Sequence, residues 1–291
     1  MTRAPALPLV PAPLAGDRFE VFRVGIFDAK DVTVFANQDR SFAFLDPQPS
    51  IDYSTYMPRQ AKLGLSAYKN TLSVIDRRFG KIGHLLPAQG TVLEIGAAEG
   101  NFLKRAHEER PNLQYVAVEP DQNTAAARAE LRWLTSYGDL DAAAAAGLKA
   151  DFICLFHVFE HIAKPKDFLA AIRKVLAPGG RVVIEVPSLD DPLLTVYALP
   201  AYEAFYFQNQ HPFVYTGRSL ARVLTDNGFK VREILPYQRY GLENHMAWMR
   251  HGKPGGDAGF ADVVSSIESG YRAALESRGT ADTVFVVGQT A

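Results

Sequence analysis

The 291-residue chain is poor in cysteine, in long apolar runs and in net charge, and each shortage excludes a class of protein. Its single cysteine, Cys154, excludes an internal disulfide and, because it stands in an apolar run, predicts a buried and unreactive thiol. No stretch comes near the ~20 uninterrupted apolar residues that a membrane-spanning helix needs. The net charge of −1 gives no basic field, so nucleic acid and anionic membrane surfaces are not expected partners. A small or neutral substrate and a cytoplasmic location fit these shortages.

The length and composition allow one large α/β domain with additions, or two modest domains. Residues 1–16 are rich in proline and alanine, and because the prolines interrupt the apolar core of a signal peptide, we expect a flexible tail. Alternating apolar and polar residues between positions 19 and 44 predict small antiparallel strands. Helical spacing between positions 53 and 79 predicts a helix across the entrance of the main domain. Residues 17–80 are therefore expected to form an accessory region with a lid helix.

From position 91 onward, short apolar runs alternate with helical spacing, which is the pattern of a doubly wound α/β sheet. Strands are expected at residues 92–95, 115–119, 151–156, 181–186 and 230–235. A last strand at residues 283–288 follows a helix that is expected from about Asp262 to Leu275. The main domain is expected over residues 81–291, and its insertion at residues 187–216, dense in aromatic residues and proline, is expected to close over a substrate.

A glycine-punctuated turn follows the first of these strands. Gly96 has access to backbone angles closed to other residues, and Gly100 is expected to let the next helix pack close to the strand. The Gly-x-x-x-Gly spacing differs from that of dinucleotide sites, and Glu94, two residues before the first glycine, suits a cationic group. Glu119 ends the second strand, at about the ~20-residue interval where such folds bind a ribose hydroxyl. This pattern disfavours a nicotinamide oxidoreductase.

These residues resemble the motifs of class I S-adenosylmethionine-dependent methyltransferases, which carry an acid-x-Gly-x-x-x-Gly turn after the first strand and an acid after the second. Residues 151–161 resemble the fourth strand of that family with its following loop, and residues 175–184 resemble its next helix, turn and fifth strand. The resemblance implies a Rossmann-like, mostly parallel sheet with an antiparallel last strand. It also implies S-adenosyl-L-methionine as cofactor and S-adenosyl-L-homocysteine as product.

The cofactor-binding residues proposed on this basis come from the glycine turn, the ends of the next two strands and the loop after the fourth. They are Glu94, Gly96, Ala97, Gly100, Asn101, Phe102, Glu119, Pro120, Asp139, Phe156 and His157. Asp139 has an equally good structural explanation as a helix N-cap.

The segment from His157 to His161 matches His-x-x-Glu-His, a zinc peptidase signature. It leaves an apolar strand directly and meets Pro165 soon afterwards, which leaves little of the long helix that such a site requires. We therefore expect no metal. In the methyltransferase interpretation, Glu160 and His161 line the active site at the switch point of the sheet, whereas His157 and Glu160 have an alternative role as caps of the following turn.

Residues 209–220 resemble a segment of nucleotide-sugar C-methyltransferases, which places His211 on the catalytic base of that family. Gln210 replaces a glutamate of that segment, and the zinc-binding cysteines of the family are absent, so carbon methylation is in doubt. Methylation of a hydroxyl needs one base of near-neutral pKa, which histidine provides. Tyr53 and Tyr56 match a tyrosine-bearing helix start of the same group, where a tyrosine holds a sugar hydroxyl or acts as an acid.

The sequence thus predicts O-methylation of a sugar, a glycan precursor or a similar small molecule, with His211 as first base and His161 as second. Methylation at carbon or nitrogen of a small metabolite and a non-catalytic S-adenosylmethionine-binding module are the alternatives. The acceptor is expected to be a small molecule such as a sugar or nucleotide sugar. The oligomeric state is open, with a homodimer among the alternatives.

Overall fold

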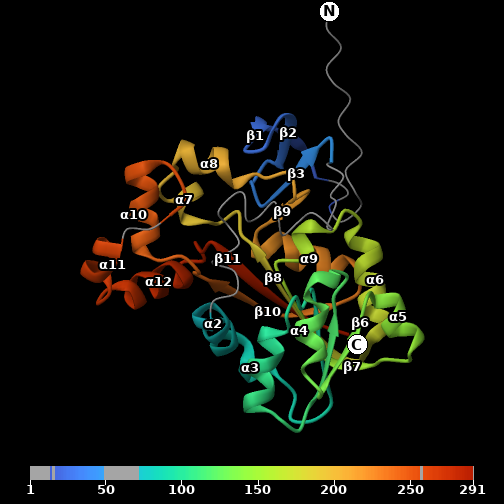
Figure 1. Cartoon of the computed structure of the whole chain (residues 1–291). Coiled ribbons are helices and arrows are strands. Elements are labelled where there is room, and N and C mark those ends of the chain that lie inside the picture. The colour runs from blue at the N-terminus through green and yellow to red at the C-terminus, as the bar shows by residue number, and fades with distance from the viewer. Residues whose placement is uncertain (1–13, 15–16, 49–71, 256–257, 291) are drawn as a thin grey trace, which may run out of the picture.

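The computed structural model describes residue 14 and residues 17–48, 72–255 and 258–290 (Figure 1). Its centre is a sheet of seven strands in the order β10-β11-β8-β7-β4-β5-β6. The strands are β4 (Thr91–Ile95), β5 (Gln114–Val118), β6 (Leu134–Tyr137), β7 (Ala150–Phe156), β8 (Leu176–Pro187), β10 (Lys230–Tyr237) and β11 (Thr283–Gln289). Neighbours from β6 to β8 pair in parallel, whereas β11 runs antiparallel to both β8 and β10. The predicted Rossmann-like fold with an antiparallel last strand is confirmed.

Helices cover both faces of this sheet (Figure 1). They are α2 (Leu72–Ile82), α3 (Asn101–Glu109), α4 (Ala125–Ala129), α5 (Leu140–Ala145), α6 (Pro165–Val175), α7 (Pro192–Thr195), α8 (Pro200–Tyr206), α9 (Gly217–Asp226), α10 (Leu242–His251), α11 (Ala258–Val264) and α12 (Glu268–Ser277). Successive strand residues point to opposite faces, so Val92 and Cys154 pack with α2 and α3, whereas Leu93 and Ile153 pack with α5, α6 and α9. Cys154 is fully buried, and burial raises its pKa, as expected for an unreactive thiol.

A second sheet of four strands, in the order β1-β2-β3-β9, joins the N-terminal region to the insertion. Its first three strands are β1 (Phe19–Ile26), β2 (Ala29–Asn37) and β3 (Phe42–Asp46), which confirms the predicted antiparallel strands. The fourth, β9 (Phe213–Tyr215), comes from the insertion and pairs antiparallel with β3. The two segments that looked separate in the sequence therefore form one unit.

The aromatic side chains of the insertion are mostly used to build this unit. Tyr202, Tyr206 and Phe207 pack with α10 against one face of the small sheet, and Phe213 and Tyr215 join the core of the main domain. All five rings are buried, so they serve in packing, and the expectation that the insertion closes over a substrate stays a prediction. The insertion is rich in apolar residues because the four-stranded sheet packs on both of its faces.

Three further predictions about elements need comment. The edge strand β6 was not predicted, because it has only four residues, which are intermediate or exposed and show little apolar periodicity. The helix expected from Asp262 to Leu275 is two helices, α11 and α12, separated by a turn. Of the predicted lid helix, only α2 is described, and Tyr53 and Tyr56 lie outside the described residues. None of the described helices combines the length and the apolar character that crossing a membrane requires.

Candidate active site

The glycine turn after β4 is held in an unusual backbone conformation. Gly96, Ala98 and Gly100 all have positive φ, of 75°, 47° and 78°. A Cβ atom on Gly96 would lie 2.4 Å from Cγ2 of Val158, so the absence of a side chain lets the loop after β7 touch the turn. Gly100 is different: a Cβ atom there would make ordinary contacts of 3.4 Å or more, so its left-handed φ, and not the predicted close packing, is the reason for glycine.

Glu119 ties the turn to the end of β5. Its Oε2 accepts a hydrogen bond from the Ala98 backbone N–H at 2.8 Å, and its Oε1 accepts one from the Asp121 N–H at the same distance. A carboxylate oxygen has two lone pairs, so each oxygen retains capacity for one more donor. The predicted role of Glu119 as a ribose ligand fits this geometry.

Glu94, in β4, is buried and has its Oε2 atom without a hydrogen-bond partner among the described residues. Burial, together with the nearby carboxylates of Glu119 and Glu185, raises the pKa of Glu94 to about 8, although the charge of Arg78 opposes this. A buried carboxyl oxygen with no partner is costly, and a cation placed beside it would relieve that cost. The site therefore fits a ligand with positive charge, as the sulfonium and ammonium groups of S-adenosylmethionine carry.

The other predicted cofactor residues surround the same turn. Phe102 and Phe156 lie edge to face, with ring centroids 4.7 Å apart, in the core under the turn. Asn101 begins α3, and its side-chain amide donates to Glu99, so it points along the surface. Asp139 accepts from the Ala142 N–H at 2.7 Å, so it is the N-cap of α5. Ala97 is buried in the turn, whereas Pro120 is exposed directly after Glu119.

Two arginines that the sequence did not single out hold this region together. Arg78 from α2 makes a buried, bidentate ion pair with Glu185 of β8, with Nε 2.5 Å from Oε2 and Nη2 3.2 Å from Oε1. Arg128 donates from below the turn to the Ala98 carbonyl and the Thr124 hydroxyl. The signal for the first pair was present in the sequence, because Glu185 interrupts the apolar and buried stretch of β8 at residues 182–186.

The second half of the site lies after β7, in the 3₁₀ turn η5 (Phe159–His161). The structure brings Glu160, His161 and His211 together, with ligand-type atoms of the three side chains all within 4.8 Å of one another. The rings of the two histidines are 4.9 Å apart, although the residues belong to different segments of the chain. Glu160 and His161 are buried and His211 is half-buried. All three predicted catalytic residues from the described part of the chain thus form one cluster.

His157 does not join this cluster but supports it from the side. Its φ of 54° places the side chain so that Nδ1 lies 3.1 Å from Glu160 Oε1. Its Nε2 lies 2.6 Å from an Arg239 nitrogen and 3.1 Å from Glu185 Oε1. These three contacts hold the ring between Glu160, Arg239 and Glu185. Because His157 leaves the strand in a left-handed conformation, it does not share a helix face with His161, so the helical site of a zinc peptidase does not form.

Glu160 is held in its ionised form by its neighbours. Burial alone would raise the pKa of Glu160, yet the His157 hydrogen bond and the charges of His161, His157 and His211 lower it to about 2. Its Oε2 atom, which is buried, has no hydrogen-bond partner among the residues that the structure describes. His161 is oriented by a contact of 2.6 Å between its Nδ1 and the Gln210 carbonyl. The cluster is therefore an anionic carboxylate next to two imidazoles, of which that of His161 is oriented by the Gln210 carbonyl.

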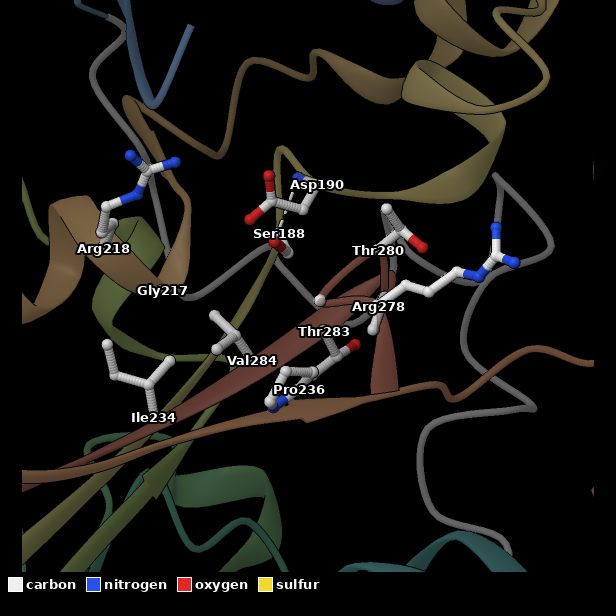
Figure 2. Close-up of a pocket in the computed structure, with 12 residues that line it drawn as sticks. Ser188, Asp190, Gly217, Arg218, Ile234, Pro236, Arg278, Thr280, Thr283 and Val284 are labelled. Atoms are coloured by element: carbon white, nitrogen blue, oxygen red, sulfur yellow. Dashed lines mark hydrogen bonds between the residues drawn. The ribbon is translucent and has the colours of Figure 1, made fainter. Parts of the chain in front are cut away.

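A hollow of about 330 Å³ lies farther along the same edge of the sheet, beyond the ends of β8 and β10 and the start of β11. Figure 2 shows Arg218 and Arg278 on opposite sides of it, with Ser188 and Asp190 between them. The Asp190 N–H donates to the Ser188 hydroxyl at 3.1 Å. No predicted site residue lines this hollow, so it is separate from the Glu160 cluster.

Comparison with known proteins shows the family of the chain. The family model described as a methyltransferase domain matches residues 67–234, which is more than half of the chain. An uncharacterised 37.1 kDa protein in transposon TN4556 of Streptomyces fradiae is 35% identical over 82 residues, which are 27% of this chain. The chain therefore spans about a quarter (24%) of the length of that curated relative.

Several solved structures share the fold. A SAM-dependent methyltransferase from Archaeoglobus fulgidus has a TM-score of 0.53 at 16% identity, over 82% of this chain and 100% of that one. A chain in the complex of the Haloferax volcanii Trm112 methyltransferase activator with a methyltransferase has a TM-score of 0.53 at 16% identity. The match covers 83% of this chain and 99% of that one. The plantazolicin methyltransferase BpumL, solved with a monoazolic desmethylPZN analog and SAH, has a TM-score of 0.53 at 12% identity. The match covers 81% of this chain and 92% of that one. With the glycine turn, Glu94 and Glu119 in place, the chain belongs to the methyltransferase domain family and is an enzyme whose cofactor is S-adenosylmethionine.

Proposed function

We propose that the enzyme methylates a hydroxyl oxygen of a small-molecule acceptor, most simply a sugar or a glycan precursor. The observation that carries the proposal is the meeting of Glu160, His161 and His211 after β7, next to the glycine turn that would bind the cofactor. In doubly wound folds, ligands bind at this edge of the sheet. An acceptor hydroxyl that enters here meets two imidazoles and a carboxylate.

When bound, S-adenosylmethionine supplies an activated methyl group on a positively charged sulfur. The protein then has to bind the cofactor, align the acceptor and remove one proton. Glu94 and Glu119 are the residues that would hold the cofactor, facing its positive charge and its ribose hydroxyls. Ala97, Asn101, Pro120, Asp139 and Phe156 would complete the surroundings of the adenosyl group.

The acceptor half of the site would supply the base. His211, half-buried, is the first candidate to take the hydroxyl proton, with His161 as the second. The Glu160 carboxylate would stabilise the imidazolium that forms, as a buried acid does beside a catalytic histidine. The accessory strands β1 to β3 and the insertion at residues 187–216 would cover the acceptor together, since β9 of the insertion pairs with β3. Exclusion of water by this cover strengthens each charge interaction inside.

A non-catalytic module that only binds S-adenosylmethionine is less well supported. Such a module would have an insertion without polar groups directed at the cofactor edge. Here the insertion contributes His211 and the Gln210 carbonyl to a buried polar cluster, which has no purpose in a sensor of the cofactor alone.

The test is a methylation screen with S-adenosylmethionine and a panel of sugars, nucleotide sugars and phenols. The expected result is formation of S-adenosylhomocysteine together with an acceptor that gains one methyl group, located on oxygen by NMR. The same screen with His211→Ala should yield product at least about 100-fold more slowly. Methylation on carbon or nitrogen would overturn the oxygen assignment, and hydrolysis of the cofactor without any methylated acceptor would overturn the proposal.

A further inference from the structure

We propose that Glu160, His161 and His211 bind a divalent transition-metal ion, such as Zn²⁺ or Mn²⁺, which holds the acceptor hydroxyl oxygen. The proposal rests on the proposed function for the identity of the acceptor, and it changes one step of it, the removal of the hydroxyl proton. It replaces the expectation from the sequence that no metal is bound.

The donor set is the first argument. Two imidazole nitrogens and one carboxylate oxygen, contributed from one side, form a ligand set that divalent zinc, iron and manganese accept with open positions left over. The three ligand-type atoms lie within 4.8 Å of one another. Ligands about one ion at ~2.1 Å are roughly 3–3.5 Å apart, so the ion would draw them together by a small movement. His211, which is half-buried, is the residue with space for that movement.

The groups around the three ligands are the second argument. Metal-binding histidines usually donate their other ring N–H to a carbonyl or carboxylate, which fixes the tautomer and the ring orientation. His161 has its Nδ1 2.6 Å from the Gln210 carbonyl, which leaves Nε2 as the nitrogen of the ring that carries a lone pair. His157 Nδ1 contacts Glu160 Oε1 at 3.1 Å and so fixes the carboxylate.

The third argument concerns Glu160 Oε2, a buried carboxylate oxygen. The side chain is only 2% exposed, and Oε2 has no hydrogen-bond partner among the residues that the structure describes. A buried carboxylate oxygen without a donor costs free energy unless a ligand satisfies it. An ion between Glu160 and the two imidazoles would satisfy this atom directly.

This arrangement also explains the His-x-x-Glu-His segment without the long helix of a peptidase. Glu160 and His161 are adjacent ligands on the 3₁₀ turn, and the third ligand, His211, comes from the insertion. His157 is a positioning residue and not a ligand, because its two ring nitrogens contact Glu160, Arg239 and Glu185. The motif therefore has a different use from the one that its spacing suggests.

Three protein ligands leave positions for oxygen atoms of the acceptor. A bound divalent ion lowers the pKa of a hydroxyl that coordinates to it, so the hydroxyl proton passes to water and not to a histidine. The acceptor oxygen still forms the bond to the methyl carbon, and the electron pair of the broken carbon–sulfur bond stays on sulfur. An acceptor with two neighbouring hydroxyls, such as a vicinal diol, is favoured, because both oxygens can coordinate.

The direct test is calorimetric titration of the full-length, tag-free, chelator-stripped protein with ZnCl₂ or MnCl₂ alone, with elemental analysis of the dialysed product. One equivalent is expected to bind. Glu160→Gln and His211→Asn should each weaken binding by at least about 100-fold, whereas the exposed His251→Asn should bind as the wild type does. Circular dichroism checks that the variants are folded, and His211→Asn, at a half-buried position, serves if Glu160→Gln unfolds. Absence of binding, or equal binding by all variants, would overturn the site.

Activity separates this proposal from the proposed function. If chelator-stripped enzyme loses O-methylation and recovers it with Mn²⁺ or Zn²⁺, both proposals stand. Full activity after stripping would overturn the metal while leaving O-methylation intact. Stoichiometric metal binding in an enzyme that methylates no hydroxyl would support the metal site and overturn the acceptor assignment.

Discussion

Two buried glutamates at the same edge of the sheet, Glu94 and Glu160, have pKa values shifted in opposite directions. Each has one carboxylate oxygen without a hydrogen-bond partner among the described residues. Burial, with the negative charges of Glu119 and Glu185 added, raises the pKa of Glu94 to about 8. Burial also acts to raise the pKa of Glu160, but three neighbouring histidines overcome it and lower that pKa to about 2.

The difference shows that burial raises the pKa of a carboxyl group unless hydrogen-bonding or cationic neighbours overcome it. Glu94 is neutral near pH 7 until a cation arrives, which suits a residue that meets a charged cofactor. Glu160 is already an anion, which suits a residue that supports imidazoles or a metal ion. The proposed cofactor half and the proposed acceptor half of the site therefore have opposite electrostatics, with a raised carboxyl pKa in the first and a lowered one in the second.

The largest effect is expected from removing the acceptor half alone. His211→Ala should lower turnover by roughly 10²–10⁴-fold, because the group that prepares the hydroxyl is lost. Affinity for S-adenosylmethionine should change by less than about twofold, since His211 does not belong to the turn. Steady-state kinetics with calorimetry measures both. A variant with full turnover would remove His211 from the reaction.

Gly96→Ala tests the close contact between the glycine turn and Val158 in the loop after β7. Its Cβ would meet Val158 Cγ2, and the φ of 75° would be strained, so we expect a loss of roughly 2–3 kcal/mol of unfolding free energy. Gly138→Ala is the matched control, because a Cβ there meets nothing within 4 Å. Urea denaturation of the two variants gives the comparison. Equal stability would show that the Gly96 contact is not strained in solution.

Glu119→Ala weakens only the cofactor half. The loss of hydrogen bonds to ribose, together with the loss of the contacts to Ala98 and Asp121, should lower the affinity for S-adenosylmethionine by about 10–100-fold. The exposed Glu130→Ala controls for the loss of a negative charge. Calorimetric titration with S-adenosylmethionine, S-adenosylhomocysteine and NAD measures it, and wild-type protein should bind the adenosyl pair and not NAD. An unchanged affinity in Glu119→Ala would reject its role.

The smallest effect concerns the pH dependence of stability. The pKa of Glu94 is raised from 4.5 to about 8 on folding, so the folded state retains a proton that the unfolded chain releases, and stability falls as pH rises from about 4.5 to 8. Glu94→Gln removes this dependence. Its stability relative to wild type, without cofactor, should therefore increase by roughly 1 kcal/mol between about pH 6 and pH 7. Denaturation curves at the two pH values would contradict this if the difference between the proteins were constant.

The residues of the cofactor half were readable from the sequence because they are close together in it. Gly96 and Glu119 directly follow the neighbouring strands β4 and β5, and Gly100 is the N-cap of α3, so periodicity and spacing place them near one another. The same reasoning gave the wrong cause for Gly100, because positive φ and close packing both require glycine and the sequence does not distinguish them. Arg78 was missed because a single arginine on a helix carries no sign of its buried partner, Glu185.

The acceptor half was only partly readable. Glu160 and His161 were placed at the site by their position after a central strand, but their contact with His211 depends on the pairing of β3 with β9. That pairing joins segments far apart in the chain. The apolar residues of the insertion fit both a packed sheet and a cover over a substrate, and the sequence does not distinguish the two. The position of His157 was not readable for a similar reason. Its φ of 54° places the residue off the helix face that its spacing from His161 suggests, and spacing alone does not show such an angle.

The most direct test of the contrast between Glu94 and Glu160 is calorimetric titration of S-adenosylmethionine into wild type, Glu94→Gln and Glu160→Gln near pH 7, in two buffers of different ionisation enthalpy. Wild type should bind and release a proton approaching one per site, because the cationic cofactor ionises Glu94. Glu94→Gln should bind more weakly with no such release, and Glu160→Gln should match the wild type. Loss of binding or of proton release in Glu160→Gln, with Glu94→Gln unchanged, would contradict the account.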